Sequence, residues 1–165
     1  MTGLALALLG VLAAAAVAMV AGLRRWLFVV TVQGGSMQPS LQDGDRVLAR
    51  RATITGIRPG DVVILERPDG NLRWTRPPTR RTPADINLLI KRVAAIPGDP
   101  PPRDTAPALV NHPAQRVPRG HLVAFGDNYE RSFDSKQIGY FPADRLIGVV
   151  LRPMRLSAGP SGSRP

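Results

Sequence analysis

The sequence has no cysteine, two lysines, two histidines and eight aromatic residues among 165. The lack of cysteine excludes disulfide bonds, thiolate zinc sites and cysteine nucleophiles, so any nucleophile must be an oxygen or an amine. Proline and glycine, in contrast, are abundant, with 17 and 16 copies. Because together they interrupt the backbone about once in five residues, they argue against a helical bundle and favour short strands joined by turns. The composition therefore predicts one mostly β domain with short appendages.

Charge is absent from residues 2–23, although the whole chain has a formal charge of +10. As a helix, this run of about 22 residues is long enough to cross a hydrocarbon core of ~30 Å. No lysine or arginine precedes it, whereas a cleaved secretory signal normally has a positive N-terminal region. We therefore expect a transmembrane anchor over residues 1–25, with a cleaved signal peptide and a buried soluble helix as the alternatives.

Clusters of valine, isoleucine and leucine, bounded by glycine, proline or aspartate, predict the strands. We expect them at residues 27–32, 46–49, 62–66, 72–75, 88–96, 121–125 and 146–151. Asp69-Gly70 lies between the third and fourth of these runs and predicts a type I′ hairpin. The β domain would extend over residues 26–156, with surface excursions at 76–83 and 97–107. Residues 157–165 should form a disordered tail.

Lysine is the rare cation of this chain, because 20 of its 22 basic residues are arginine and only Lys91 and Lys136 are lysine. A guanidinium keeps its proton in proteins, whereas a buried ammonium can lose it and act as a general base. Strand alternation places Lys91 on one face with Leu89 and Val93. If this face is buried, desolvation lowers the pKa of Lys91 from about 10.4. The alternative is that both lysines are ordinary surface residues.

A second candidate is Ser36, which follows Gly34-Gly35 at the end of the first predicted strand. The two glycines allow the backbone to approach a substrate closely, and Pro39 restricts the exit of the turn. Ser36 could thus be an exposed nucleophile, although composition alone favours a simple turn serine. The two histidines lie in a loop and at a strand start, where structural roles are usual, so a Ser-His-Asp triad is a minor alternative.

Four blocks of the sequence resemble those of type I signal peptidases, which are membrane-anchored serine endopeptidases with a Ser-Lys dyad. Residues 35–41, Gly-Ser-Met-Gln-Pro-Ser-Leu, are similar to the family's nucleophile block. Residues 43–45 and 58–63 are similar to the next block, and residues 91–99, Lys-Arg-Val-Ala-Ala-Ile-Pro-Gly-Asp, to the block with the general-base lysine. Residues 126–136 resemble the last. The four blocks occur in the family's order, which makes the signal specific.

The resemblance implies a signal-peptidase-like antiparallel β domain and a role for each matching residue. Neutral Lys91 would take the hydroxyl proton of Ser36, which would attack a peptide carbonyl and form an acyl-enzyme. Ser132 would orient Lys91, and no metal or cofactor is expected. The remaining implied residues are the structural supports Arg92, Asp127 and Asp134, the glycines of the oxyanion loop, Gly34 and Gly35, and the substrate-binding residues Met37 and Pro39.

Two positions depart from the family's pattern. Some members have a serine that helps to hold the oxyanion where this chain has Gly34, so the oxyanion would depend on main-chain N–H groups such as that of Ser36. Where the family usually has arginine in its last block, this chain has Lys136. Lys136 is therefore a second candidate base, although an exposed structural ion pair with Asp134 is the favoured interpretation.

The implied substrates are preproteins with Ala-x-Ala cleavage regions, bound by strand addition. The lipid bilayer is the other expected partner. Nucleic acid is not expected, because neither a groove-reading helix nor an aromatic RNA platform is visible. Two alternatives stay open: a Ser-Lys protease dedicated to the maturation of one substrate, and a catalytically silent basic β module anchored in the membrane.

The expected location is the plasma membrane, with a single span and the catalytic domain outside the cytoplasm. Arg24 and Arg25 directly follow the apolar run, and Trp26 stands where an aromatic belt would lie. By the positive-inside rule these arginines predict the opposite orientation, with the domain in the cytoplasm. Sequence alone therefore leaves the orientation open.

Overall fold

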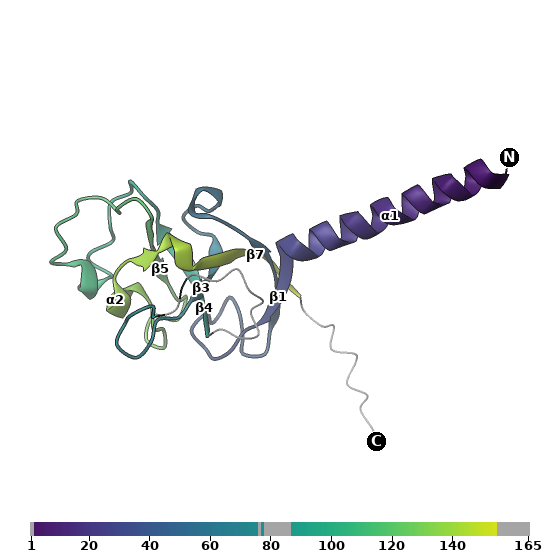
Figure 1. Cartoon of the computed structure of the whole chain (residues 1–165). Helices are drawn as coiled ribbons and strands as arrows, with labels where there is room; N and C mark the ends of the chain where they lie inside the picture. Colours follow the sequence, from purple (N-terminus) through teal and green to yellow (C-terminus); the bar gives the residue numbers. More distant parts are fainter. Residues whose placement is uncertain (1, 76, 78–86, 155–165) are drawn as a thin grey trace, which may run out of the picture.

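The computed structural model describes residues 2–75, 77 and 87–154. The elements, in chain order, are α1 (Thr2–Trp26), β1 (Leu27–Thr31), β2 (Arg46–Arg51), β3 (Val62–Glu66), β4 (Leu88–Ala95), β5 (His121–Phe125), α2 (Ser135–Ile138), β6 (Phe141–Pro142) and β7 (Leu146–Met154). The strands form one body, from which α1 projects (Figure 1). The prediction of a mostly β domain is confirmed.

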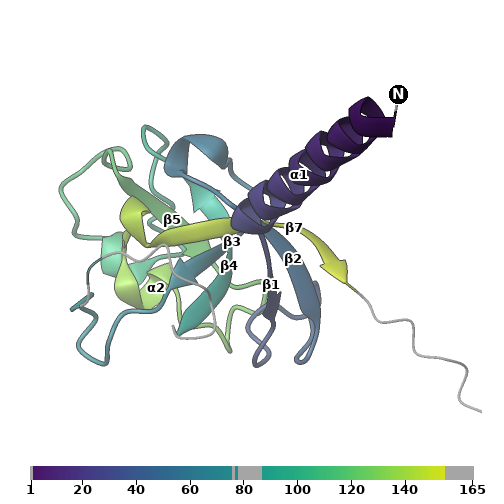
Figure 2. The same ribbon diagram turned by 45° about the vertical axis from the view of Figure 1, so that its right-hand side comes forward.

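The seven strands form one antiparallel sheet in the order β1-β2-β7-β3-β4-β5-β6. β1 lies at one edge and pairs only with β2. β4 lies further inside, where Lys91 pairs with Val63 of β3 and the adjacent Arg92 with Phe125 of β5. Three strands separate β1 from β4, and the strands around them curve in Figure 2. The curl of the sheet brings both strands to one core cluster, which contains Val30 of β1 and Ile90 of β4.

The hydrophobic core contacts both faces of the central strands. On β4, Leu89 and Val93 belong to one buried cluster, whereas Ile90 belongs to a second cluster on the other face. β3 divides in the same way, with Leu65 in the first cluster and Ile64 in the second. Strands buried on both faces read as continuous apolar runs, as β3 does from Val62 to Leu65, whereas Lys91 and Arg92 interrupt the apolar run of β4. Lys91 therefore lies within the core, on the side of Leu89 and Val93.

The N-terminal helix α1 has an apolar and largely exposed surface. Leu9, Val11 and Val17 are among its exposed large side chains. β1 begins at the residue that follows the helix, without a connecting loop. Among the residues that the structure describes, no helix meets both the length and the apolarity needed for a membrane span. The expected anchor is thus a helix, but a membrane span is not confirmed.

The expected strand at 72–75 and its type I′ hairpin at Asp69-Gly70 are wrong. Asp69 Oδ1 accepts hydrogen bonds from the amides of Asn71 and Arg73, at 2.9 and 2.8 Å, and Leu72 has a φ of 60°. These local bonds occupy the main-chain donors that a strand would present to a neighbour. β3 instead pairs with β4. Most of the expected excursion at 76–83, and the expected tail at 157–165, lie outside the described residues.

Candidate active site

Ser36 lies in a tight turn that follows β1. The turn is closed by main-chain hydrogen bonds from Gln38 to Gly35 and from Leu41 to Met37. Met37 is 1% exposed and packs into the core with the β1 residue Val30, which fixes the backbone of the turn. Ser36, the preceding residue, is half-buried.

Lys91 reaches Ser36 from the inner strand β4. Its Nζ donates a hydrogen bond to Ser36 Oγ over 2.8 Å, although 55 residues separate the two in sequence. Lys91 is only 1% exposed and is the largest of the fully buried side chains in the described part of the chain. The condition that the Lys91 face be buried is thus met, and the curl of the sheet creates a contact between hydroxyl and amine.

Burial lowers the pKa of Lys91 to about 8, because few water molecules can solvate its ammonium. The negative charge of Asp134 opposes this effect, while the positive charges of Lys136 and Arg67 add to it. With a pKa of about 8, about a tenth of the molecules carry a neutral amine at pH 7. This side chain can therefore act as a base at ordinary pH.

Arg92 connects the neighbouring segments on the opposite side of β4. Its guanidinium binds both carboxylate oxygens of Asp127, at 2.8 and 2.6 Å. It also donates to Gly60 O at 2.9 Å and to Ser40 Oγ at 3.3 Å. Burial alone would raise the pKa of Asp127, but the hydrogen bond and charge of Arg92 outweigh it, and that pKa is lowered. Arg92 and Asp127 thus link β4 to the nucleophile turn and to the last sequence block.

Asp134 and Lys136 form a buried ion pair behind the dyad. Lys136 Nζ lies 2.7 Å from Asp134 Oδ2, and the two side chains are 8% and 0% exposed. Asp134 also caps α2 and accepts the amide of Gly126 at 2.9 Å. Burial would raise the pKa of Asp134, but the Gly126 amide and Lys136 outweigh it and the pKa falls. The Lys136 ammonium lies over the ring of Tyr129, 4.5 Å from its centre. The expected ion pair between Lys136 and Asp134 is confirmed, but the expectation that it is exposed is wrong, because both side chains are buried.

Ser132 is buried next to the nucleophile turn. A Cβ atom at Gly126 would overlap both Ser132 Oγ and the carbonyl oxygen of Ser36, so these three residues are in close contact. Within the described residues, Ser132 Oγ has no hydrogen-bond partner. Its role in orienting Lys91 therefore stays a prediction.

In the described structure, the amide of Ser36 is a free main-chain donor that could serve an oxyanion. Gly34 has a φ of 79°, and its amide donates to Asp43 Oδ1 over 2.7 Å, so it is already occupied. The Ser36 carbonyl accepts the amide of Asn128 at 3.0 Å. No acceptor for the Ser36 amide is found among the residues described. An oxyanion formed beside Ser36 could be held by that amide.

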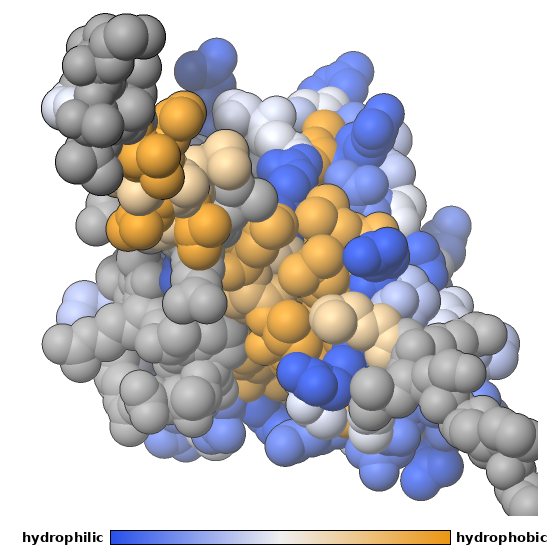
Figure 3. All heavy atoms as spheres, turned by 90° about the vertical axis from the view of Figure 1, so that its right-hand side faces the viewer, coloured by the Kyte–Doolittle hydropathy of each residue, from blue (hydrophilic) through white to orange (hydrophobic). Residues whose placement is uncertain are grey.

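A groove of about 990 Å³ opens beside the dyad. It is lined by β1, by the glycines before Ser36, by residues 87–91 and by Phe133. Figure 3 views the domain from the side on which α1 projects, and it shows apolar side chains gathered there beside hydrophilic ones. Met37 lies in the wall of the groove, whereas Pro39 lines a neighbouring cavity instead. Edge strand β1 offers unpaired main-chain groups along the groove, which suits an extended peptide.

Three residues near the dyad received no role from the sequence. Gly126 is packed too closely for any side chain, Asn128 binds the Ser36 carbonyl, and Arg131 lies beside Gly35. All three lie within residues 126–136, which resemble the family's last block as a whole, without a role for these residues. A glycine directly after a predicted strand is a signal of close packing. The contacts of Asn128 and Arg131 depend on tertiary structure and have no local signal.

Comparison with known proteins agrees with this geometry. The family described as "Signal peptidase, peptidase S26" matches residues 4–100 and 101–154. Mitochondrial inner membrane protease subunit 1 of Mus musculus is 32% identical over 124 residues, which cover 74% of this chain and 66% of the relative. The human subunit 1 is 30% identical over 145 residues, 82% of this chain and 78% of the relative.

Two further relatives show a similar likeness. Probable signal peptidase I-1 of Synechocystis sp. is 30% identical over 141 residues, 73% of this chain and 67% of the relative. Thylakoidal processing peptidase 1 of Arabidopsis thaliana is 29% identical over 136 residues, but the match spans only 39% of that relative. Together with the match along nearly the whole chain, these likenesses show that the protein belongs to the signal peptidase family, peptidase S26.

Proposed function

We propose that this protein is a membrane-anchored serine endopeptidase that removes signal peptides from exported preproteins, with Ser36 as nucleophile and Lys91 as general base. The observation that carries the proposal is the 2.8 Å contact between Ser36 Oγ and a fully buried Lys91 Nζ. An amine in this position can take the hydroxyl proton at neutral pH, because burial holds the pKa of Lys91 at about 8.

The proposed reaction proceeds in two halves. Neutral Lys91 Nζ accepts the proton of Ser36 Oγ as this oxygen bonds to the peptide carbonyl carbon, and the Ser36 amide holds the resulting oxyanion. When the C–N bond breaks, the leaving amine takes the proton from Lys91, and an acyl ester on Ser36 is left. Water then attacks the ester with Lys91 again as the base, which releases the new carboxyl end and restores the Ser36 hydroxyl.

Cleavage of a preprotein tests this mechanism. The full chain in detergent is incubated with a preprotein that has an Ala-x-Ala site, and the cut is located by mass spectrometry. We expect Ser36→Ala and Lys91→Arg to abolish cleavage, because the first removes the nucleophile and the second a base that can lose its proton. Lys136→Arg is the matched control and should retain most of the activity, because it keeps the charge next to Asp134.

Unchanged cleavage after Ser36→Ala would contradict the proposed nucleophile. Full activity of Lys91→Arg would remove Lys91 from the mechanism, and loss of activity only in Lys136→Arg would transfer the role of base to Lys136. Cleavage of one particular precursor, but not of general Ala-x-Ala substrates, would indicate a dedicated maturation protease. Binding of lipid or nucleic acid without hydrolysis of any preprotein would indicate a catalytically silent module.

Helix α1 is the proposed attachment to the membrane. Its exposed apolar side chains, such as Leu9, Val11 and Val17, have no protein neighbours to cover them in the described structure, and residues 2–23 have no charge. We expect the chain to stay in the membrane fraction through alkaline carbonate washing, and a Leu9→Lys, Val17→Lys double variant to be released. Retention of that variant would contradict the proposal. Protease digestion of sealed vesicles would then decide on which side the domain lies.

A further inference from the structure

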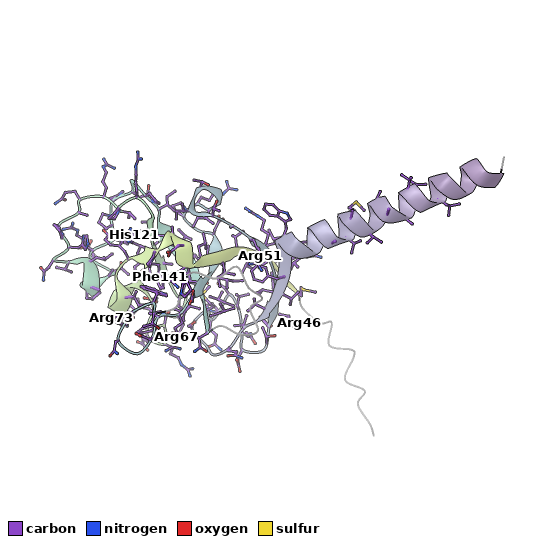
Figure 4. All side chains as sticks on the ribbon, in the orientation of Figure 1. Arg46, Arg51, Arg67, Arg73, His121 and Phe141 are labelled. Atoms are coloured by element: carbon purple, nitrogen blue, oxygen red, sulfur yellow. The ribbon has the colours of Figure 1, made fainter. Side chains whose placement is uncertain are left out.

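Among the described residues, the groove beside the dyad is lined by cations and by no carboxylate. Arg51, Arg67, Arg131 and Lys91 line it, whereas none of the aspartates and glutamates that the structure describes does. Arginine keeps its charge at every pH relevant to proteins, so at least three positive charges surround this cavity. Figure 4 labels Arg51 near the base of α1 and Arg67 at a distance from it, so the charge is spread along the groove.

Arg131 is a second cation next to the nucleophile turn, in addition to Lys91. Its Nη1 lies 3.7 Å from the position that a Cβ atom of Gly35 would occupy, which places the guanidinium beside the residue preceding Ser36. The Arg131 amide donates to Asn128 Oδ1 at 3.3 Å, and the Asn128 amide donates to the carbonyl of Ser36 at 3.0 Å. The segment that carries Arg131 is therefore attached directly to the nucleophile.

Arg67 contributes a second charge from the end of β3. Its guanidinium lies over the ring of Phe133, 5.1 Å from the ring centre, and Phe133 also lines the groove. The Arg67 amide donates to Asn87 O at 2.9 Å, which fixes its backbone next to β4. A cation stacked on an aromatic ring in this way keeps its N–H edges available for another acceptor.

These two arginines differ from those in the body of the domain. Arg92 pairs with Asp127 and Arg145 with Glu66, at 2.6 and 3.1 Å. Within the described residues, neither Arg67 nor Arg131 has a carboxylate at ion-pair distance. Both side chains are exposed. Guanidinium groups without a partner at the rim of a peptide groove match a carboxylate on the peptide.

Building on the proposed peptidase function, we propose that the preferred substrate has an acidic side chain within about two residues of the cleaved bond, where Arg131 binds its carboxylate and Arg67 adds attraction. Consecutive residues of an extended peptide lie about 3.5 Å apart, so a carboxylate beside Gly35 belongs to a residue close to the scissile carbonyl. Ion pairs at exposed sites contribute up to about 1 kcal/mol, which corresponds to a roughly fivefold preference.

The test is a set of matched substrates cut by the full chain in detergent. In one cleavable precursor, each of the three residues on either side of the cut is replaced in turn by Glu, Gln and Lys, and kcat/KM is measured. At one position or more we expect Glu to exceed Gln by about fivefold and Lys to fall below Gln. Arg131→Gln should bring the Glu/Gln ratio close to one and Arg67→Gln should reduce it, whereas Arg131→Lys should retain most of it. Arg119→Gln, a control outside the groove, should leave it unchanged.

Binding to the Ser36→Ala variant gives an independent readout. The Glu substrates should bind about fivefold more tightly than the Gln substrates at low salt, and the difference should shrink at high salt. Equal ratios for wild type and Arg131→Gln at all positions would overturn the inference and leave the peptidase function standing. Absence of cleavage and of binding would overturn both. Arg131-dependent binding of anionic but not zwitterionic vesicles, with no preference for Glu, would assign the groove cations to lipid headgroups instead.

Discussion

Replacement of Lys91 by methionine should stabilise the fold while it abolishes cleavage. Methionine has a similar length and no charge, so it can fill the same buried space next to Leu89 and Val93. Wild-type Lys91 is 1% exposed, and below its pKa the folded protein must hold an ammonium in the core. The variant avoids this cost, and the same change removes the proposed base.

The size of the effect follows from the pKa of Lys91. A decrease from 10.5 to about 8 corresponds to about 3 kcal/mol of unfavourable free energy for the charged form. The variant also loses the hydrogen bond between Lys91 Nζ and Ser36 Oγ, which contributes about 1 kcal/mol. We therefore expect the free energy of unfolding at pH 7 to increase by about 2 kcal/mol.

The pH dependence has a defined sign. Below pH 8 the lysine is protonated in both states, so the folded wild type bears the full cost. Between about 8 and 10.5 the unfolded state binds more protons than the folded state, and wild-type stability rises with pH relative to the variant. Above 10.5 the cost is gone and the lost hydrogen bond should make the variant the less stable protein.

Urea unfolding of the full chain in detergent, followed by tryptophan fluorescence from pH 6 to 11, measures this difference. Lys136→Met is the matched control because it also removes a buried lysine. It should destabilise by about 3 kcal/mol, since Asp134 is then buried without its partner. A Lys91→Met variant that is less stable than wild type at pH 7, or a difference independent of pH, would refute the reasoning.

The remaining predictions concern activity and packing. kcat/KM should rise with pH and level off above about pH 8, as neutral Lys91 becomes the main form; a flat profile from pH 6 to 9 would contradict this. Lys136→Met should move that midpoint to higher pH, because the positive charge of Lys136 no longer lowers the pKa of Lys91, whereas Lys136→Arg should not move it. Gly126→Ala should abolish activity and destabilise by about 2 kcal/mol in the same urea assay, because its Cβ overlaps the nucleophile turn. Gly70→Ala should change neither the activity nor the free energy of unfolding, because there is open space around Gly70.

Local sequence patterns predicted the fold well where burial is continuous. The apolar runs at 62–66 and 121–125 match β3 and β5 residue for residue, and 88–96 matches β4 except for its last residue. The run at 72–75 was misread because Asp69 satisfies the main chain locally, a competition that alternation does not reveal. β6 has two residues, too few for any periodic pattern.

The sequence names candidate residues of the site but does not predict their contacts. The rarity of lysine and strand alternation make Lys91 a candidate base if its face is buried, and the double glycine makes Ser36 a candidate nucleophile. The 2.8 Å contact between them requires the curl of the sheet, which no local pattern encodes. The position of Arg131 beside Gly35 was not predicted either, because it depends on the hydrogen bonds of Asn128.

The nucleophile and its partner belong to parts of the sheet with different resistance to opening. Ser36 follows edge strand β1, which has one neighbour, whereas Lys91 lies on β4, held from both sides. Edge elements can detach with less free energy than the interior. Mild denaturant or heat should thus inactivate the protein before it unfolds, because β1 detaches while the other strands stay folded. This loss of activity should be reversible.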